Sequence, residues 1–534
     1  MTLPPGVAAR DFENALRQWE RAVGKEWVFT SDADLDLYRD SYSPFWHEPE
    51  DPVPSAAVAP DGVEQVQQVV RIANTHRIPL WTISTGKNLA YGGSAPRLSG
   101  SVVLDLKRMN RILEVDDRNH YALVEPGVSY FDLYRHTQEK GLSVFIDAPD
   151  PGWGSPVGNT LDRGGGHTPL RDHFASLCGL EVVLANGDVV RTGMGAIPNS
   201  KTWQQYKYGF GPYVDGIFTQ SNYGVVTKMG LWLYPMPEMR ITGIVTVPKH
   251  DDLIPMVDIL AYLMNSNIVQ GTTTIGGPLL GPPRDPELVA LRSQPGGASI
   301  AELEAYVQRK GLPYWSIELP FYGPTEVVAA QWQFAKRKYS AIPGVEFRDG
   351  TSFRLPPDAE ALAKIGNPVP LGVPSLAIFS SLVPRGQGHV DFSPITPMSG
   401  QAVFEAMEVF DRTLREMGMT NVGVVPAGTY YPRSFFFLFI FPVEHDVEKN
   451  RKMRAAFRRV IEVGTEHGWG EYRTHTAFMD DVANAYSFNN HALRRLHETI
   501  KDALDPNGIL APGKSGIWPK SMRNRRPENR GAKA

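Results

Sequence analysis

Hydrophobic residues recur at helical spacing in several long segments of the chain. Val66, Val69, Val70 and Ala73 fall on one face of residues 63–77, which predicts an amphipathic helix. The same criterion predicts a helix at 130–141 that Gly141 closes. Further helices are predicted at 251–266, 299–311, 324–342, 400–418 and 446–468.

Shorter apolar or alternating runs lie between these segments and predict strands. Residues 180–193 carry Asn186-Gly187 between two such runs, the strongest short signal for a β-hairpin. The densest apolar run, Phe435–Val443, is expected to form a buried strand. The other predicted strands are 55–60, 78–84, 101–106, 121–129, 221–235, 240–248, 314–323, 389–395 and the pair within 421–443.

The order of these elements predicts an α+β fold with two units. Beyond Pro237 a rhythm of strands and helices occurs about twice, typical of a mostly antiparallel sheet with helices on one face. Residues 276–297 are rich in Gly and Pro and are expected to be irregular. Because the last fifty residues resemble a return to the first unit, we predict domains at 1–236 and 237–479, with 480–534 completing the first and ending in a basic tail.

Length and composition restrict the class of protein. A chain of 534 residues exceeds what one hydrophobic core usually serves, which agrees with two domains. The net charge of −4 gives no indication of nucleic-acid binding, and no apolar stretch approaches the length of a membrane span. One cysteine, Cys178, excludes an internal disulfide, and no metal site is expected. The lone thiol and the absence of an apolar signal-like N-terminal segment favour the cytoplasm.

Two glycine-rich segments are candidates for binding a cofactor. Residues 84–93 follow a predicted strand and combine glycines with Lys87, so their backbone N–H groups can surround an anion such as pyrophosphate. The spacing fits neither a dinucleotide-binding GxGxxG helix start nor a P-loop. Residues 150–159, followed by Gly164, Gly165 and Gly166, form the second segment. Each segment alone is equally compatible with a surface turn.

Three side chains suggest a site for a phenol or a flavin. Tyr472 and Arg473 place a hydroxyl beside a guanidinium, which can bind a phenolate, although such pairs usually form surface salt bridges. His389 lies at the start of a predicted strand, where a single histidine is more often structural than catalytic. These residues do not by themselves identify an activity.

Seven ordered blocks between about residues 50 and 520 resemble the vanillyl-alcohol oxidase family, and the likeness is weaker between 265 and 420. The blocks are PLWTISTGKNLAYGGSAPRLSGSVVLDL, VEPGVSYFDLY, GNTLDRGGGHTP, LEVVLANGDVVRTGMGA, YGFGPYVDGIFTQSNYGVVTKMGLWL, GWGEYRTHTAFMDDV and DPNGILAPGKSGIWP. The resemblance implies a two-lobed FAD-binding domain with an inserted cap domain. The cap would be an antiparallel sheet covered by helices, and it would form the substrate pocket.

The resemblance also implies which residues hold FAD. Its pyrophosphate would lie on residues 85–89 and its ring against 150–155. Covalent attachment through the flavin 8α-methyl group would use His389, and the alternative is a tyrosine link, for which Tyr430 and Tyr431 lie in the right part of the chain. The implied FAD-binding residues are Thr85, Gly86, Lys87, Asn88, Leu89, Pro149, Gly152, Gly154, Ser155, Gly158, Asn159, Gly224, Val225, His389, Arg473 and Lys514.

The family's phenolate-binding trio corresponds to Tyr91, Tyr472 and Arg473. Ionising a phenol near pH 7–8 requires roughly 3–4 kcal/mol of stabilisation, which one cation and two hydroxyl donors can supply. Asp150 corresponds to the family's acid beside the flavin, where it would stabilise a p-quinone methide and activate water. Gly154 would leave room for O2, which would be reduced to hydrogen peroxide.

Several departures from the family concern the para-substituent end of the pocket. His167 replaces a pocket tyrosine, Asp391 follows two residues after His389, and Arg433 lies in a variable stretch. They predict a bulkier or more oxygenated phenol, such as a lignin-derived one. The alternatives are a cytochrome-coupled alkylphenol dehydrogenase, a sugar oxidase on the same fold, or a flavin-binding protein without turnover. Relatives imply a homodimer or a larger homo-oligomer.

Overall fold

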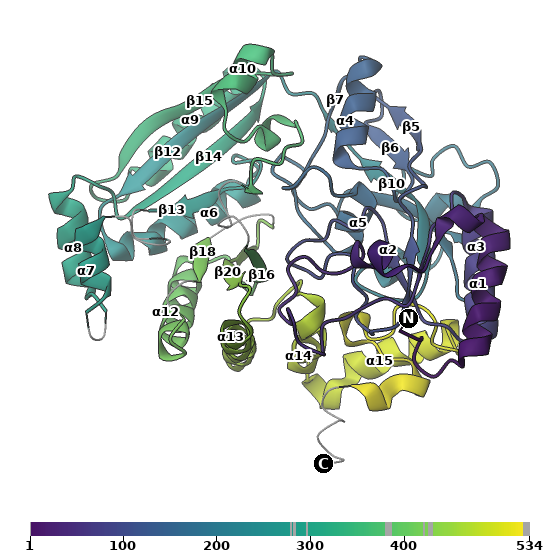
Figure 1. Cartoon of the computed structure of the whole chain (residues 1–534). Coiled ribbons are helices and arrows are strands. Elements are labelled where there is room, and N and C mark those ends of the chain that lie inside the picture. The colour runs from purple at the N-terminus through teal and green to yellow at the C-terminus, as the bar shows by residue number, and fades with distance from the viewer. Residues whose placement is uncertain are drawn as a thin grey trace.

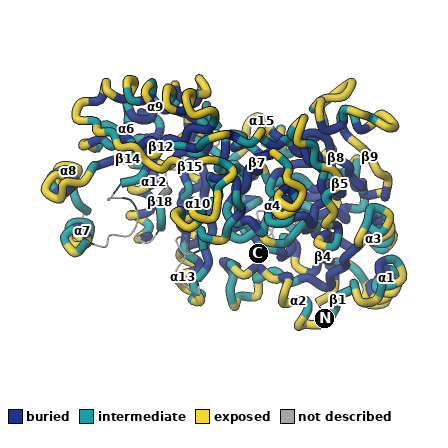
Figure 2. The backbone as a smooth tube through the Cα atoms, turned by 90° about the horizontal axis from the view of Figure 1, so that it is seen from above, coloured by how far each residue is buried: buried dark blue, intermediate teal, exposed yellow. Residues whose placement is uncertain are grey.

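The computed structural model describes residues 2–277, 280, 285–294, 297–379, 387–419, 422–425 and 431–526. The molecule has two halves, of which one holds the N-terminal region with helices α14 and α15, and the other holds the middle of the chain (Figure 1). Buried residues form separate cores in the two halves, and exposed positions gather on the outer helices (Figure 2). The α+β class predicted from the sequence is confirmed.

The first sheet carries a parallel strand–helix–strand unit. Its order is β1-β2-β4-β3, in which β2 and β3 both run parallel to β4. α3 (Val63–His76) connects β2 to β3 and buries the apolar face that its spacing predicts. α1 (Ala9–Val23) packs beside α3. The strands are β1 (Val28–Phe29), β2 (Ala57–Val58), β3 (Leu80–Ile83) and β4 (Val102–Asp105).

The second sheet is fully antiparallel and has the order β5-β6-β10-β8-β9. The predicted hairpin at Asn186-Gly187 joins β8 to β9, and Gly187 takes the positive φ (+83°) that this turn requires. The strands are β5 (Ile112–Asp116), β6 (Tyr121–Val124), β8 (Leu177–Val183), β9 (Val189–Arg191) and β10 (Val225–Trp232). The small elements nearby are α2 (Asp32–Asp36), α4 (Tyr130–Glu139), α5 (Pro156–Leu161), β7 (Val144–Phe145) and β11 (Tyr234–Pro235).

The other half is an antiparallel sheet with helices packed against it. The order is β13-β14-β12-β15, and α9 packs across β12 and β14 (Figure 1). Its strands are β12 (Met239–Val247), β13 (Thr274–Gly276), β14 (Trp315–Gly323) and β15 (Glu346–Arg354). The helices are α6 (Leu253–Asn265), α7 (Pro286–Arg292), α8 (Ile300–Arg309), α9 (Thr325–Tyr339), α10 (Ala359–Lys364), α12 (Gly400–Glu416) and α13 (Val447–Glu466).

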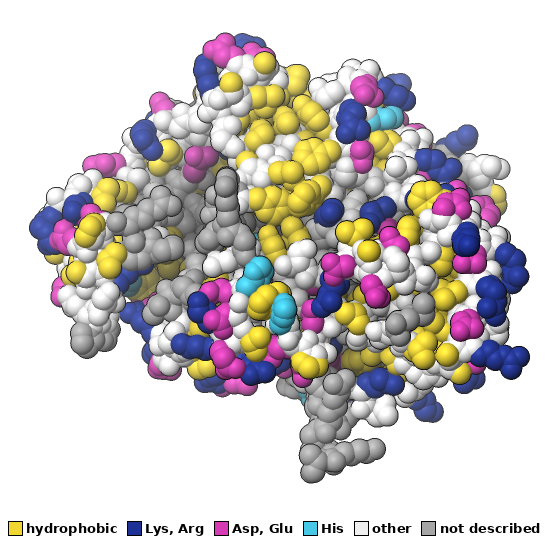
Figure 3. All heavy atoms as spheres, in the orientation of Figure 1, with side chains coloured by type: hydrophobic (Ala, Val, Ile, Leu, Met, Phe, Trp, Pro, Cys, Tyr) yellow, Lys and Arg dark blue, Asp and Glu magenta, His cyan; other side chains and the backbone are white. Residues whose placement is uncertain are grey.

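Two short sheets extend this half toward the first one. β16 and β18 both pair with β20, and β17 pairs with β19. The bounds are β16 (Gly388–Phe392), β17 (Ile395–Pro397), β18 (Gly423–Val425), β19 (Ser434–Phe436) and β20 (Leu438–Val443). On one face of the molecule, hydrophobic side chains gather along the junction between the halves (Figure 3).

Two local expectations were wrong, and one strand was missed. The run 435–443 forms two strands in different sheets, because Phe437 between them donates its backbone N–H to Pro394 O instead. The run 435–443 is apolar throughout, so its sequence did not indicate that two strands would form. The stretch 276–297 contains α7, which begins with Pro286 at its first turn, a position where proline is favoured. β15 was not predicted, because it is a mostly exposed edge strand without apolar alternation (Figure 2).

The chain returns to the first half after α13, through α14 (Met479–Ala485) and α15 (Phe488–Leu504). Ile509 and Leu510 belong to the core of the first sheet, where Leu510 bridges to Leu80 in parallel. The fully buried Lys501 fixes this return, donating from Nζ to Asp505 Oδ2, Asn222 O and Leu510 O at 2.7 Å each. The exact domain boundaries at 236 and 479 remain predictions.

No helix in the part of the chain that the structure describes has both the length and the apolar character needed to cross a bilayer.

The buried pair gives a first prediction. Asp505→Ala leaves the Lys501 ammonium buried without its counter-charge, which typically costs about 3–5 kcal/mol. We therefore expect a large fall in melting temperature, which circular dichroism would measure. Asp502→Ala is the matched control on the same helix, since the Asp502–Arg523 pair is about one-third exposed and should contribute under about 1 kcal/mol. Equal effects of the two substitutions would contradict this account.

Candidate functional site

A cavity of about 230 Å³ lies where the two glycine-rich segments meet in the first half. It adjoins a second cavity of about 460 Å³, and both are lined by Asn88, Tyr91, Asp162, Gln220 and Arg473. The predicted residues that line the first cavity are Thr85, Gly86, Lys87, Asn88, Leu89, Tyr91, Pro149, Asp150, Gly154, Ser155, Gly158, Asn159, Gly224, Arg473 and Lys514. Segments far apart in the sequence therefore form one continuous wall.

The first glycine segment turns sharply after β3. Gly86 has φ +67°, and a Cβ atom there would lie 2.3 Å from Ser94 Oγ, so only glycine fits without a shift. Ser94 Oγ donates to Gly86 O at 3.0 Å and fixes the turn. Beside it, the Lys87 ammonium lies 5.2 Å from the centre of the Trp153 ring. The turn brings backbone and one cation to the cavity edge.

The second segment leads into α5 and packs closely against the first. Ser155 caps this helix by accepting hydrogen bonds from Val157 N at 3.2 Å and Gly158 N at 3.4 Å. A Cβ atom on Gly158 would lie 2.4 Å from Ser84 Oγ, so the absence of a side chain allows the two segments to approach. The separation of the two segments is thus set by the missing side chain of Gly158 and by the hydroxyl groups of Ser84 and Ser155.

Arg473 is the central cation of the site. Its Cζ lies 3.9 Å from the centre of the Tyr91 ring, and Nη2 donates to Asn88 Oδ1 at 2.7 Å. Its buried Nε has no hydrogen-bond partner among the described residues. Gln220 holds the neighbouring backbone by donating to Tyr472 O at 2.7 Å. The structure therefore brings the predicted trio Tyr91, Tyr472 and Arg473 together. Among the described residues, the Nε donor of Arg473 is left without an acceptor.

Burial decides the protonation of this trio. It raises the pKa of Tyr91 well above its ordinary value and also raises that of Tyr472, with Arg473 opposing both shifts. Burial disfavours the charge on Arg473, but nearby Tyr91, Asp162 and Tyr472 together raise the pKa of the guanidinium. The two tyrosines are therefore neutral hydroxyl donors, and the arginine is a permanent cation.

His389 and Asp391 lie two positions apart on the same strand, β16. Both are buried, and His389 Nε2 lies 3.6 Å from Asp391 Oδ1. His389 Nδ1 is buried without a hydrogen-bond partner among the described residues, and the Tyr42 ring lies 5.3 Å away. Burial raises the pKa of Asp391, while His389, Arg473 and the Tyr91 hydroxyl lower it. This pair therefore lies next to Tyr91 and Arg473.

Asp150 is held from both halves of the molecule. Its Oδ2 lies 3.2 Å from His167 Nε2, and Asn367 Nδ2 lies 3.2 Å from Oδ2 and 3.4 Å from Oδ1. His167 was predicted as a pocket residue, but Asn367 was not. It lies in a proline-rich segment after α10 that carries no recognisable motif, so only the folded structure reveals the contact.

Some predicted residues lie outside the cavity wall. Gly152 contacts the segment after α10, donating to Ser375 O at 2.8 Å, and Val225 is buried in β10 beside Gly224. Arg433 is exposed just before β19. Lys514 lines the cavity and donates to Asp162 Oδ1 at 3.0 Å. Asp162 is a site residue that sequence reasoning missed, since an acid after a short helix carries no distinctive signal.

The cavity has the features that FAD requires. Glycine turns allow close approach of backbone N–H groups, and Lys87 supplies positive charge for a pyrophosphate at the cavity edge. Within the described part of the chain, Nδ1 of His389 has no hydrogen-bond partner, so it is a buried nitrogen with a free lone pair behind the site. In the described part of the chain no group of three or more His, Cys, Asp or Glu side chains is arranged to bind a metal.

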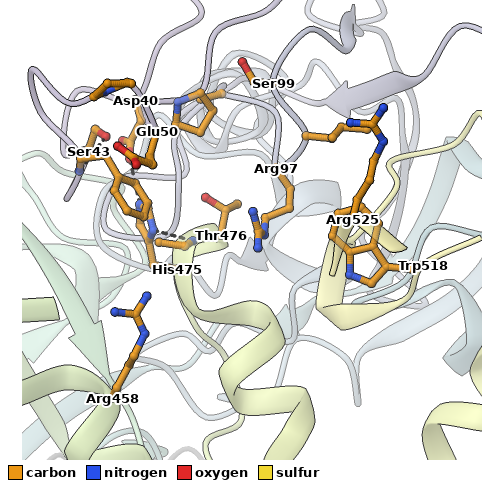
Figure 4. Close-up of a pocket in the computed structure, with 16 residues that line it drawn as sticks. Asp40, Ser43, Glu50, Arg97, Ser99, Arg458, His475, Thr476, Trp518 and Arg525 are labelled. Carbon is orange, nitrogen blue, oxygen red and sulfur yellow. Dashed lines mark hydrogen bonds and ion pairs between the residues drawn. The ribbon is translucent and has the colours of Figure 1, made fainter. Parts of the chain in front are cut away.

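A separate cavity of about 400 Å³ lies on the other side of Thr476 and is distinct from this site (Figure 4). Several of its charged groups already have partners. His475 Nε2 lies 2.8 Å from Asp40 Oδ2, and Arg97 Nη2 lies 2.6 Å from Asp480 Oδ2. Neither Asp150 nor Arg473 is among the described residues that line it.

Two family models match the chain. The FAD binding domain model covers residues 54–193, and the model for FAD linked oxidases, C-terminal domain, covers residues 378–515. Among curated proteins, the chain is 36% identical over 528 residues to the 4-cresol dehydrogenase [hydroxylating] flavoprotein subunit of Pseudomonas putida. That match covers 96% of this chain and 97% of the relative.

Solved structures agree with these matches. A 4-ethylphenol oxidase from Gulosibacter chungangensis, in an isoeugenol complex, superposes with a TM-score of 0.85 at 33% identity, covering 98% of this chain and 100% of that one. A p-cresol methylhydroxylase with substrate bound gives 0.84 at 35% identity, covering 97% and 99%. Both likenesses extend over both halves of the molecule.

The buried acid next to the trio gives a pH-dependent prediction. Burial raises the pKa of Glu471 well above its ordinary value of 4.5, so the folded chain binds this proton more tightly than the unfolded chain. Stability therefore falls as the pH rises between the unfolded and folded pKa values. Glu471→Gln removes this titration. We therefore expect the melting temperature of this variant, relative to that of the unaltered protein, to rise as the pH increases above about 5.

The control is Glu408→Gln, which changes an exposed side chain on α12. Its melting temperature should follow that of the unaltered protein at every pH. A Glu471→Gln variant whose difference stays constant from pH 5 to pH 9 would contradict the raised pKa.

Proposed function

Since this chain belongs to the vanillyl-alcohol oxidase family of FAD-dependent oxidoreductases, we propose that it oxidises para-substituted phenols and passes the electrons to O2, releasing hydrogen peroxide. The observation that carries this proposal is the buried contact of Arg473 with Tyr91 at 3.9 Å, beside Tyr472. A sugar oxidase would have no use for a permanent cation flanked by two neutral phenol donors. A phenolate is the ligand that this arrangement favours.

Each residue of the site has a proposed role that follows from its position. Tyr91 and Tyr472 donate hydrogen bonds to the substrate oxygen, and Arg473 balances its negative charge as the phenol ionises. When bound, FAD would supply the chemistry that the chain lacks, as the acceptor of the hydride from the benzylic carbon. Asp150, on the cavity wall, provides negative charge near the carbon that becomes electron-poor, and it favours the p-quinone methide product.

The buried Nδ1 of His389, which has no hydrogen-bond partner among the described residues, supports covalent attachment of the flavin at this residue. The alternative residue Tyr430 lies outside the described residues. Tyr431 is described, and its hydroxyl donates to Arg163 O at 3.4 Å. His389 is therefore the better candidate for the link.

The proposal that O2 is the electron acceptor has one alternative, a cytochrome partner. Gly154 supports an oxidase, since even an added Cβ atom would find only Pro151 O at 3.4 Å, so space remains beside the cavity. The Pseudomonas putida relative is named a dehydrogenase and a subunit, which supports a cytochrome-coupled enzyme instead. Peroxide formation in air distinguishes the two.

Three further properties belong to the proposal. The polar partners of Asp150 favour a phenol with a bulkier or more oxygenated para-substituent, such as one from lignin. We also propose a homodimer or a larger homo-oligomer. A cytoplasmic location suits the single buried thiol, Cys178.

The direct test adds 4-alkylphenols and 4-hydroxybenzylic alcohols to the purified protein. We expect anaerobic loss of the yellow flavin colour and, in air, stoichiometric peroxide. Arg473→Lys keeps one charge but loses the planar donor set, so kcat/KM should fall about 100- to 1,000-fold. Arg163→Lys, at an exposed position beside the adjoining cavity, is the matched control. A flavin that no phenol reduces would exclude phenol oxidation.

The covalent link has its own test. After denaturation in acid, the unaltered protein should retain its flavin on the polypeptide, visible as fluorescence in a gel. His389→Ala should still bind FAD but release it on denaturation, because the nucleophilic nitrogen is gone. Flavin found on a tyrosine-containing peptide, or free FAD from the unaltered protein, would show that His389 is not the attachment residue.

A further inference from the structure

The second cavity, of about 460 Å³, extends from the protein surface to the predicted phenol-binding trio. Tyr91, Tyr472 and Arg473 line its inner end. Its outer end is lined by Leu493 and Leu496 of α15, which are 47% and 56% exposed. Both α14 and α15 lie at the lower edge of the molecule in Figure 1. The cavity therefore connects the solvent to Arg473.

The position of Tyr472 distinguishes the two adjoining cavities. Tyr91 and Arg473 line both of them, whereas Tyr472 is among the described residues that line the second cavity and not among those that line the first. The first cavity has the features that FAD requires, so a phenol that Tyr472 and Arg473 hold needs a different approach. The second cavity provides one, because it reaches all three residues of the trio.

The lining of the second cavity suits a molecule with an apolar ring and one polar end. Ile217, Val482 and Ile500 add apolar side chains to the wall, and hydroxyl and guanidinium donors gather at the inner end. Sites for small molecules are typically about 300–1,000 Å³ in volume and mostly apolar, with a few polar groups that orient the ligand. A phenol has the matching division between ring and hydroxyl group.

The two acids that line this cavity do not oppose the approach of an electron-rich phenol oxygen. Asp162 is neutralised by Lys514, whose Nζ donates to Asp162 Oδ1 at 3.0 Å. Glu471 accepts from Ser393 N at 3.2 Å, and burial raises the pKa of this acid well above 4.5, so it is uncharged. The inner end therefore keeps the positive charge of Arg473.

We propose that the second cavity is the passage by which phenols enter and leave the site, with Leu493 and Leu496 at its mouth. The inference rests on the proposed phenol oxidation and adds the route that the substrate takes. A passage has a distinctive kinetic signature. Narrowing it slows arrival and departure by the same factor, because the molecule crosses the same barrier in both directions, and the affinity does not change.

The experiment uses 4-fluorophenol as the probe, since it has no benzylic carbon and cannot be oxidised by hydride loss. Stopped-flow measurement of the change in flavin absorbance gives its association and dissociation rate constants with the holoenzyme. The double variant Leu493→Trp/Leu496→Trp narrows the mouth, so we expect both rate constants to fall about 10-fold with Kd unchanged. Leu493→Ala/Leu496→Ala widens the mouth and should lower neither constant.

Leu312→Trp is the matched control. Leu312 is 40% exposed, similar to Leu493, and it is not among the described residues that line either cavity. The substitution adds the same apolar surface away from the passage. Its rate constants and Kd should equal those of the unaltered protein.

Unchanged rate constants in the Trp double variant would overturn the passage, since phenols would then arrive by another route. A weaker Kd with an unchanged association rate would also overturn it, because the two leucines would then contact the bound phenol instead of its path. Failure of the unaltered holoenzyme to bind 4-fluorophenol is a different outcome, because it would refute the phenol site of the proposed function itself.

Discussion

A guanidinium cation buried away from water must find compensation from the protein on every side, and Arg473 imposes this requirement on the site. The Tyr91 ring covers one face, Asn88 accepts from Nη2, and Asp162 contributes negative charge. Asp391 and Glu471 lie close by, but burial raises the pKa of both, which limits the competing negative charge. The positive charge thus remains available for an anionic substrate oxygen.

The same requirement explains why the site is assembled from distant parts of the chain. Asn88 and Tyr91 come from the turn after β3, whereas Arg473 follows α13 and is placed by the other half of the molecule. Asp150 is likewise held by His167 from its own half and Asn367 from the other. Relative displacement of the halves would disturb the contacts of Arg473 and of Asp150 together.

Regular patterns in the sequence predicted many of the helices and strands but few of the site residues. The helix 63–76, the Asn186-Gly187 hairpin and the helix 400–416 each have a local signal, and each forms where predicted. β15 has a weak local pattern, and its conformation depends on tertiary packing. α7 has a local start signal in Asp285 and Pro286, but the surrounding Gly- and Pro-rich stretch obscured it. Tyr91, Tyr472 and Arg473 were linked only through resemblance to a family. Asn367 has no signal at all, because its partner lies 217 positions away.

The return of the chain through Leu510 and Lys501 also has a consequence for biosynthesis. The strand that contains Leu80 is bridged by Leu510, and Lys501 bonds to the carbonyl of Asn222, so early segments depend on much later ones. A ribosome delivers these partners several hundred residues apart, and domains generally fold as units during synthesis. The inserted half can therefore fold while the flavin-binding half still waits for its final segment, and cofactor loading becomes a late step in maturation.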